Sequence, residues 1–234
     1  MSTATATAAK QKNIPLWIAP TPMKTSSVIC FKAHMKNNYW LSNFATCDIP
    51  VVPSSFLVDE KEMKCPTEET RELVFPSVEH AFQAITCLHP SHMHVFARGS
   101  DLADPAKFVE LCELAQIALP DLAPWKLGPD AVGWIAKFVT SHPKVMEKLG
   151  LRARSEFDSP LSRMEGYVTT TSGKRVSQRD ALLSTLIAIK FSKVADQNRK
   201  LRKKLKRTRN AFLLEMHGNR GKINRWTGKL VYAD

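Results

Sequence analysis

The sequence predicts a compact, mainly helical α+β domain with a few short strands. Three observations support this fold class: apolar residues recur at helical spacing in several segments, the strand-like apolar runs are short, and turn-forming prolines and asparagines separate them. The chain has 234 residues, 44% hydrophobic and 24% charged, which is enough to bury one core. We therefore expect a single domain over residues 14–234, preceded by a disordered tail of small side chains at residues 1–13.

The elements of the N-terminal half follow from apolar residues and turn signals. Residues 28–31 predict a short strand, and residues 50–72 mix prolines with acidic residues as a long loop or a hairpin does. Ser77 is a good N-cap, and apolar residues at helical spacing follow it. We therefore expect a helix to begin at Val78.

Three further helices are expected in the middle of the chain. Asp104 caps a helix over residues 106–118, with a proline in its first turn, and residues 134–149 are predicted to be helical around Pro143. Ser177 caps the clearest helix. Its apolar stripe predicts deep burial and comprises Ala181, Leu182, Thr185, Leu186 and Ile189, with Leu183 and Ile187 beside it.

Positive charge is concentrated near the C-terminus. Residues 199–209 contain eight basic and no acidic residues, in a chain whose net charge is +12. Leu201 and Leu205 lie four apart, so the tract predicts a helix with both leucines on one face. It is either a solvated helix, a helix that contacts the phosphates of RNA, DNA or a dinucleotide, or a nuclear-localisation signal. The candidate phosphate-contacting residues are Arg199, Lys200, Arg202, Lys203, Lys204, Lys206, Arg207 and Arg209.

Several classes of protein and site are excluded by what the sequence lacks. No apolar run approaches the roughly 20 residues of a membrane span, so no membrane partner is expected, and the N-terminus has no secretory signal. The five cysteines include no Cys-x-x-Cys pair, which predicts a reducing intracellular compartment, cytoplasmic or nuclear. No Gly-rich phosphate loop is present. His89, His92 and His94 lack a cysteine or acidic partner, so we expect surface or loop histidines, no metal and no cofactor.

Glu79 and His80 stand in the first turn of the helix that follows Ser77. The helix dipole favours a carboxylate there, so Glu79 is either a simple N-terminal charge or a general acid/base at the mouth of a pocket. Just upstream, Tyr39, Trp40 and Phe44 either stack on a flat base or fill the core.

Four segments occur in the order seen in the NADAR (YbiA-like) N-glycosidase family, which this chain resembles over roughly residues 28–232. They are N-Y-W-L-S-N-F at 38–44, P-S-V-E-H-A-F-Q-A at 76–84, A-I-K-F-S at 188–192 and L-R-x-x-L-x-x-T-x-x-x-x-L-L-E at 201–215. The resemblance implies a compact, mainly helical α+β fold. It also implies cleavage of N-glycosidic bonds to ribose, in phosphorylated riboflavin-pathway intermediates or in ADP-ribose attached to guanine.

The resemblance also implies roles for individual residues. Glu79 matches the family glutamate and is the expected catalytic carboxylate. The expected substrate is a ribosyl or ADP-ribosyl compound, and no cofactor is implied. The positions expected to bind this substrate or to orient its neighbours are Tyr39, Ser42, Asn43, Gln83, Lys190 and Trp226.

Three positions depart from the family pattern. Thr86 stands where typical members have a lysine that is a candidate amine nucleophile, and threonine cannot form a Schiff base. Residues 173–176 lack an expected tryptophan, and residues 215–228 lack an expected aspartate. Two hypotheses therefore stay open. The chain is an active N-glycosidase, or it is a catalytically lapsed relative that binds nucleic acid or forms a structural subunit of a larger assembly.

Overall fold

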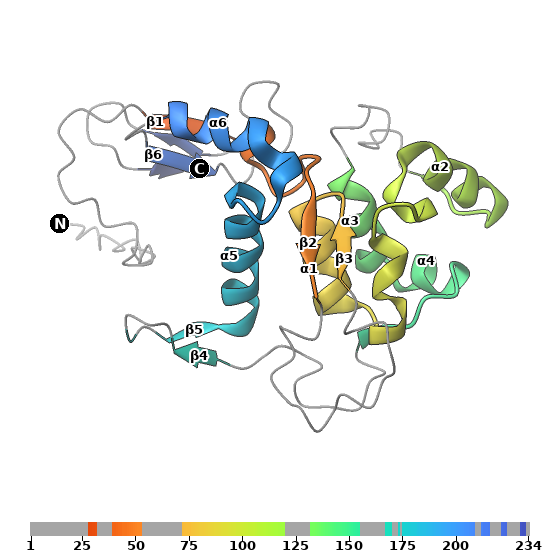
Figure 1. The fold of residues 1–234 in the computed structure, drawn as a ribbon. Helices are drawn as coiled ribbons and strands as arrows, with labels where there is room; N and C mark the ends of the chain where they lie inside the picture. Colours follow the sequence, from red (N-terminus) through yellow and green to blue (C-terminus); the bar gives the residue numbers. More distant parts are fainter. Residues whose placement is uncertain are drawn as a thin grey trace, which may run out of the picture.

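The computed structural model describes much of the chain and combines helices with short strands, as the sequence predicts for an α+β fold (Figure 1). The predicted tail at residues 1–13 lies outside the described residues, so its disorder stays a prediction. Within the described part of the chain, no helix is both long and apolar enough to cross a membrane. The described residues are 28–31, 39–52, 72–119, 132–154, 167–169, 173, 175–208, 212–215, 221–223 and 230–232.

The α-helices are α1 (Val78–Cys87), α2 (Pro105–Leu114), α3 (Gly133–Ser141), α4 (Pro143–Lys148), α5 (Gln178–Phe191) and α6 (Arg199–Arg207). Short 3-10 helices are η2 (Tyr39–Leu41), η5 (Pro90–Phe96), η6 (Asp101–Ala103) and η11 (Asp196–Asn198). The strands lie in two-stranded sheets. Strand β1 (Val28–Phe31) runs parallel to β6 (Phe212–Glu215). The other described pairs are antiparallel: β2 (Ile49–Val51) with β3 (Leu73–Phe75), β4 (Tyr167–Thr169) with β5 (Arg175–Ser177), and β7 (Gly221–Ile223) with β8 (Leu230–Tyr232).

The three predicted helix caps are confirmed. The side chains of Ser77, Asp104 and Ser177 each accept a hydrogen bond from a backbone N–H in the first turn of α1, α2 and α5. Such bonds satisfy N–H groups that have no partner inside the helix, and each stabilises a helix by about 1 kcal/mol. Local sequence chemistry therefore sets where these helices begin.

The helix ends differ from the prediction in two places. Helix α2 ends at Leu114, because Gln116 adopts a left-handed φ of 52° and the N–H that follows it donates to the carbonyl of Cys112 at 2.8 Å. The helix predicted over residues 134–149 is divided into α3 and α4. Pro143 opens α4 and has no amide hydrogen with which to continue α3.

The region predicted to be loop-like over residues 154–175 contains a strand that the prediction missed. Tyr167–Thr169 pairs with the strand that ends at Ser177, so a hairpin precedes α5. Most of the stretch at 50–72, predicted to be a long loop or a hairpin, lies outside the described residues, and the strands at its two ends, β2 and β3, pair antiparallel.

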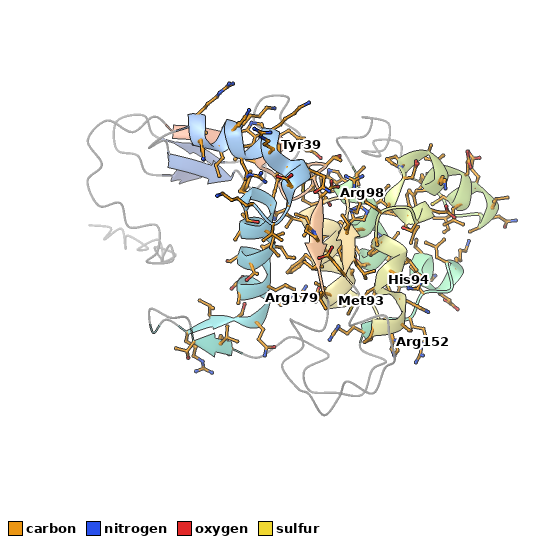
Figure 2. The ribbon with its side chains drawn as sticks, viewed as in Figure 1. Tyr39, Met93, His94, Arg98, Arg152 and Arg179 are labelled. Atoms are coloured by element: carbon orange, nitrogen blue, oxygen red, sulfur yellow. The ribbon has the colours of Figure 1, made fainter. Side chains whose placement is uncertain are left out.

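Helix α5 is less deeply buried than its apolar stripe predicts. Its buried residues are Leu182, Leu186 and Lys190, four apart, while Ile187 is 37% exposed. The buried face packs against α1, and the guanidinium of Arg179 lies 5.4 Å from the ring centroid of Phe82 (Figure 2). Among the described residues, Leu183 and Ile189 beside this face are partly buried, so the apolar stripe is covered only in part.

The core lies around α1, which contacts α3, α5 and the β2–β3 hairpin (Figure 1). Phe75, Ile85 and Phe96 are fully buried within it, and Phe108 of α2 joins the same cluster. Because α1 is central, polar side chains at its start, including Glu79, are also enclosed.

Candidate functional site

Three segments far apart in the sequence meet at the start of α1. The backbone N–H of Glu79 donates to the carbonyl of Asn43 at 3.0 Å. The ammonium group of Lys190, on α5, donates to the carbonyl of Ser42 at 2.7 Å. Residues 39–44, α1 and α5 therefore bring together most of the residues that the sequence assigns to the site.

Glu79 is enclosed and has a defined partner. It is 7% exposed, and the side-chain amide of Gln83 donates to its carboxylate at 2.6 Å. The carbonyl oxygen of the same amide accepts hydrogen bonds from the hydroxyl of Thr140 at 2.8 Å and from the thiol of Cys87 at 3.1 Å. These two donors fix the orientation of the amide, so its NH₂ group faces Glu79.

Lys190 is 1% exposed, which is rare for a lysine, because an ammonium ion is costly to remove from water. Its hydrogen bond to Ser42 and its position 5.4 Å from the ring centroid of Phe191 offset part of this cost. Burial raises the pKa of the neighbouring Cys47 thiol, and the positive charge of Lys190 opposes that rise. With its pKa raised, Cys47 stays a protonated thiol at neutral pH and is a poor nucleophile.

The turn at residues 39–44 is held by internal contacts. Ser42 is fully buried, and its hydroxyl accepts a hydrogen bond from the N–H of Phe44 at 3.2 Å. The ring of Phe44 stacks on Trp134 with 4.4 Å between centroids, and its carbonyl accepts the N–H of Gly133. Of the two interpretations given for the aromatic residues, Phe44 therefore fills space against α3. Whether Ser42 and Asn43 bind a sugar stays a prediction.

The base-holding role expected for Tyr39 also stays a prediction. Tyr39 opens η2 and is partly buried, and it lies near α6 in Figure 2. The neighbouring Trp40 contacts both helices of this region: its ring lies edge-on to Phe191 of α5, and the ammonium of Lys204 of α6 is 5.9 Å from its centroid.

Thr86, at the position of the family lysine, has its side chain engaged with its own helix. Its hydroxyl donates to the carbonyl of Phe82 at 2.7 Å, and the residue is 7% exposed. Threonine commonly bonds in this way to the preceding helical turn. Trp226 and Arg209, two further residues that the sequence assigns to binding, lie outside the described residues.

His80 is a structural residue. The backbone N–H of His80 donates to the hydroxyl oxygen of Ser77, and that hydroxyl donates back to Nδ1 at 3.0 Å, while Nε2 donates to the carbonyl of Leu102 at 3.2 Å. Burial lowers its pKa to about 4, so the ring is neutral at physiological pH.

Of the two alternatives predicted for the histidines at 89–94, surface or loop, His89 is a loop residue between α1 and η5, and it is buried. This residue is 8% exposed and its ring accepts the N–H of Ser91, which caps η5. His92 accepts the N–H of Arg152 at 2.8 Å, and His94 is exposed. In the part of the chain that the structure covers, no group of three His, Cys, Asp or Glu residues could hold a metal ion.

The predicted basic helix is confirmed as α6. It has no buried residue, and Leu201 and Leu205 are its partly buried apolar side chains, as expected for a helix anchored by two leucines. Beside it lies an open hollow of about 370 Å³. The residues that line the hollow are Lys193, Asp196, Arg199, Arg202, Lys203 and Lys206.

Thr140 and Cys87 are the residues of the Glu79 network that the sequence reasoning missed. Thr140 lies on α3, far along the chain from Gln83, and no motif connects the two. Cys87 lies four residues after Gln83 on α1, so helical spacing alone could have suggested that contact.

Comparison of the chain with family models, with curated proteins and with solved structures finds no match.

Proposed function

We propose that the chain is an N-glycosidase of the NADAR type that hydrolyses an N-ribosyl or ADP-ribosyl linkage at Glu79. The observation that supports this proposal best is the position of Glu79. Its enclosed carboxylate accepts from Gln83, its backbone N–H donates to Asn43, and Lys190 donates to the adjacent Ser42 carbonyl. Three of the four segments that resemble the family are therefore in contact.

The chemistry needs a fixed carboxylate. As the bond from the anomeric carbon to the base nitrogen breaks, its electron pair leaves with the base, and positive charge develops on the ribose. A carboxylate in a poorly hydrated site stabilises that charge and accepts a proton from the attacking water, while the departing base takes up a proton. In this proposal Gln83 positions Glu79, and Lys190 holds the turn at residues 39–44.

Hydrolysis by water is preferred here to an amine nucleophile. Thr86 has no amine, and the ammonium of Lys190 is buried and donates to the Ser42 carbonyl. A Schiff base would require Lys190 to lose a proton and to leave that carbonyl.

The second candidate function is a catalytically lapsed relative that binds nucleic acid or serves as a structural subunit. The specific observation in its favour is Thr86, whose hydroxyl is bonded to the helix backbone where the family has a lysine. The two candidates differ in whether the wild-type chain releases any product.

The experiment is to incubate the purified chain with ADP-ribosylated guanosine and with a phosphorylated riboflavin-pathway aminopyrimidine riboside, and to measure release by mass spectrometry. We expect release from one of them, and a loss of about 10²-fold or more in kcat for Glu79→Gln. This variant keeps an oxygen for the Gln83 amide, so the thermal midpoint should change little.

The matched control is Glu110→Gln, the same substitution at an exposed position of α2. It should leave turnover unchanged. Equal turnover in the wild type and in Glu79→Gln would remove Glu79 from the mechanism. No release by the wild type from either substrate would favour the lapsed relative.

A further inference from the structure

The exposed charge of the described molecule is most concentrated on α6. Seven of its nine residues are basic, none is buried, and its side chains stand out from the ribbon (Figure 2). Like charges three and four residues apart destabilise a helix by a few tenths of a kcal/mol for each pair. The proton transfer proposed at Glu79 involves none of these side chains.

The hollow beside α6 has a structured base. Arg202 donates to the carbonyls of Ser192 at 2.6 Å and Ala195 at 2.7 Å, and forms an ion pair with Asp196 at 3.3 Å. These bonds fix the segment between α5 and α6 and leave the Arg202 side chain 16% exposed. Arg202 is therefore a structural cation, and Asp196, the acidic lining residue, is paired with it.

The other lining residues are all cations. Arg199, Lys203 and Lys206 recur at helical spacing on one face of α6, and Lys193 faces the same hollow from the end of α5. Arg199 and Lys206 lie seven positions apart, which is about 10 Å along the helix axis, so these side chains can contact several phosphates at once. Every residue that lines the hollow is charged, and five of the six are cations, which suits contacts with phosphate oxygens.

The amount of charge favours a polymer over a small phosphate. A single phosphate group brings at most about two negative charges. The positive charge continues past the hollow around α6 through Lys200, Lys204 and Arg207. A chain of phosphodiesters supplies anions at regular intervals over the same length, and it releases counterions as it binds.

We propose that the hollow between η11 and α6, together with the adjoining face of α6, binds the phosphodiester backbone of a nucleic acid. The described hydrogen bonds of Glu79 involve none of the residues that line the hollow, and binding there needs no catalysis. The proposal therefore does not depend on the glycosidase function.

The test is fluorescence anisotropy of labelled oligonucleotides of one length, as duplex DNA, duplex RNA and single-stranded RNA, over a series of salt concentrations. We expect binding whose log affinity falls linearly with log salt. The double variant Lys203→Gln/Lys206→Gln removes two phosphate contacts, so the slope should become shallower by about 1.4 to 1.8. Its affinity at about 0.1 M salt should fall by at least tenfold.

The matched control is Lys137→Gln/Lys144→Gln, which makes the same change in net charge at exposed positions of α3 and α4. It should keep the wild-type slope and an affinity within about twofold. Glu79→Gln should also bind as the wild type does, which separates failure of this proposal from failure of the glycosidase.

Three results would overturn the proposal. The first is an equal loss of affinity in both double variants, because net charge alone would then explain binding. The second is binding that does not depend on salt. The third is displacement of the oligonucleotides by tripolyphosphate at an equal concentration of phosphate groups, because the hollow would then be a site for a small polyphosphate.

Discussion

The two neighbours Glu79 and His80 show how one turn of helix holds two ionisable groups in different ways. The carboxylate accepts from a side-chain amide and keeps a small exposed fraction of 7%, whereas the imidazole is fully buried. Both imidazole nitrogens have partners, Ser77 and the carbonyl of Leu102. The carbonyl can only accept, so Nε2 carries a proton, and with the pKa lowered by burial to about 4 the neutral ring accepts from Ser77 at Nδ1. His80 therefore links α1 to η6, and Glu79 is the residue to which we assign the proposed chemistry.

The low pKa of His80 predicts a loss of stability in weak acid. The pKa is about 4 in the folded chain and about 6.5 when unfolded, so the unfolded state binds the proton first as the pH falls. The stability that the neutral His80 ring provides is complete above pH 6.5. The free energy of unfolding should then fall by about 3 kcal/mol between pH 6.5 and 4. The measurement is the thermal midpoint at several pH values for the wild type and for His80→Asn.

Asparagine does not titrate, so His80→Asn should lose less stability than the wild type between pH 7 and 5, even if it is less stable at pH 7. His94→Asn is the matched control, because His94 is exposed, and it should follow the wild type. Parallel pH profiles for the wild type and His80→Asn would contradict a neutral buried imidazole.

At the scale of elements, α3 and the turn at residues 39–44 fit together through a glycine. A Cβ at Gly133 would lie 2.5 Å from the Cα of Phe44, and its N–H donates to the Phe44 carbonyl at 3.2 Å. The adjacent Trp134 stacks on the Phe44 ring. Because Asn43 accepts the N–H of Glu79, this packing also determines where the start of α1 meets the turn.

Gly133→Ala should therefore destabilise the fold by about 1–3 kcal/mol, since backbone atoms must move to admit the methyl group. For a chain of this size each kcal/mol lowers the thermal midpoint by roughly 2–4 °C. Lys137→Ala, at an exposed position on the same helix, is the control and should change it little. An unchanged midpoint in Gly133→Ala would mean that α3 and the turn are not in close contact.

Predictions from the sequence succeed where an element is specified by its own residues. The caps at Ser77, Asp104 and Ser177 rest on hydrogen bonds within one turn, and all three helices begin as predicted. The depth of burial of α5 depends on which elements surround it, and its apolar stripe alone overestimates it. The same limit applies to the site: Gln83 stands on a predicted helix, but its partner Thr140 comes from α3, whose position no local pattern reveals.

At the scale of the whole molecule, the parallel pairing of β1 with β6 joins the two ends of the chain. Val28 is in register with Phe212 and Phe31 with Glu215 (Figure 1). The strand at residues 28–31 was predicted with its observed bounds, but its partner was not, because strand pairing across the full sequence leaves no periodic signal. Such non-local pairing carries a cost in loop entropy, which slows folding.

This pairing predicts different effects for two N-terminal truncations. A chain starting at Asn13 keeps β1 and should unfold at the same temperature as the full chain, because small polar side chains bury little surface. A chain starting at Lys32 lacks β1, so β6 loses the hydrogen bonds of a four-residue ladder, about 2–4 kcal/mol in total. Amide hydrogen exchange at residues 212–215 should then accelerate strongly, while exchange in α1 changes less because its contacts with α3 and α5 remain. Unchanged exchange at residues 212–215 in the shorter chain would show that β6 is protected without β1. An equal loss of stability in both truncations would show that residues 1–12 contribute to the fold.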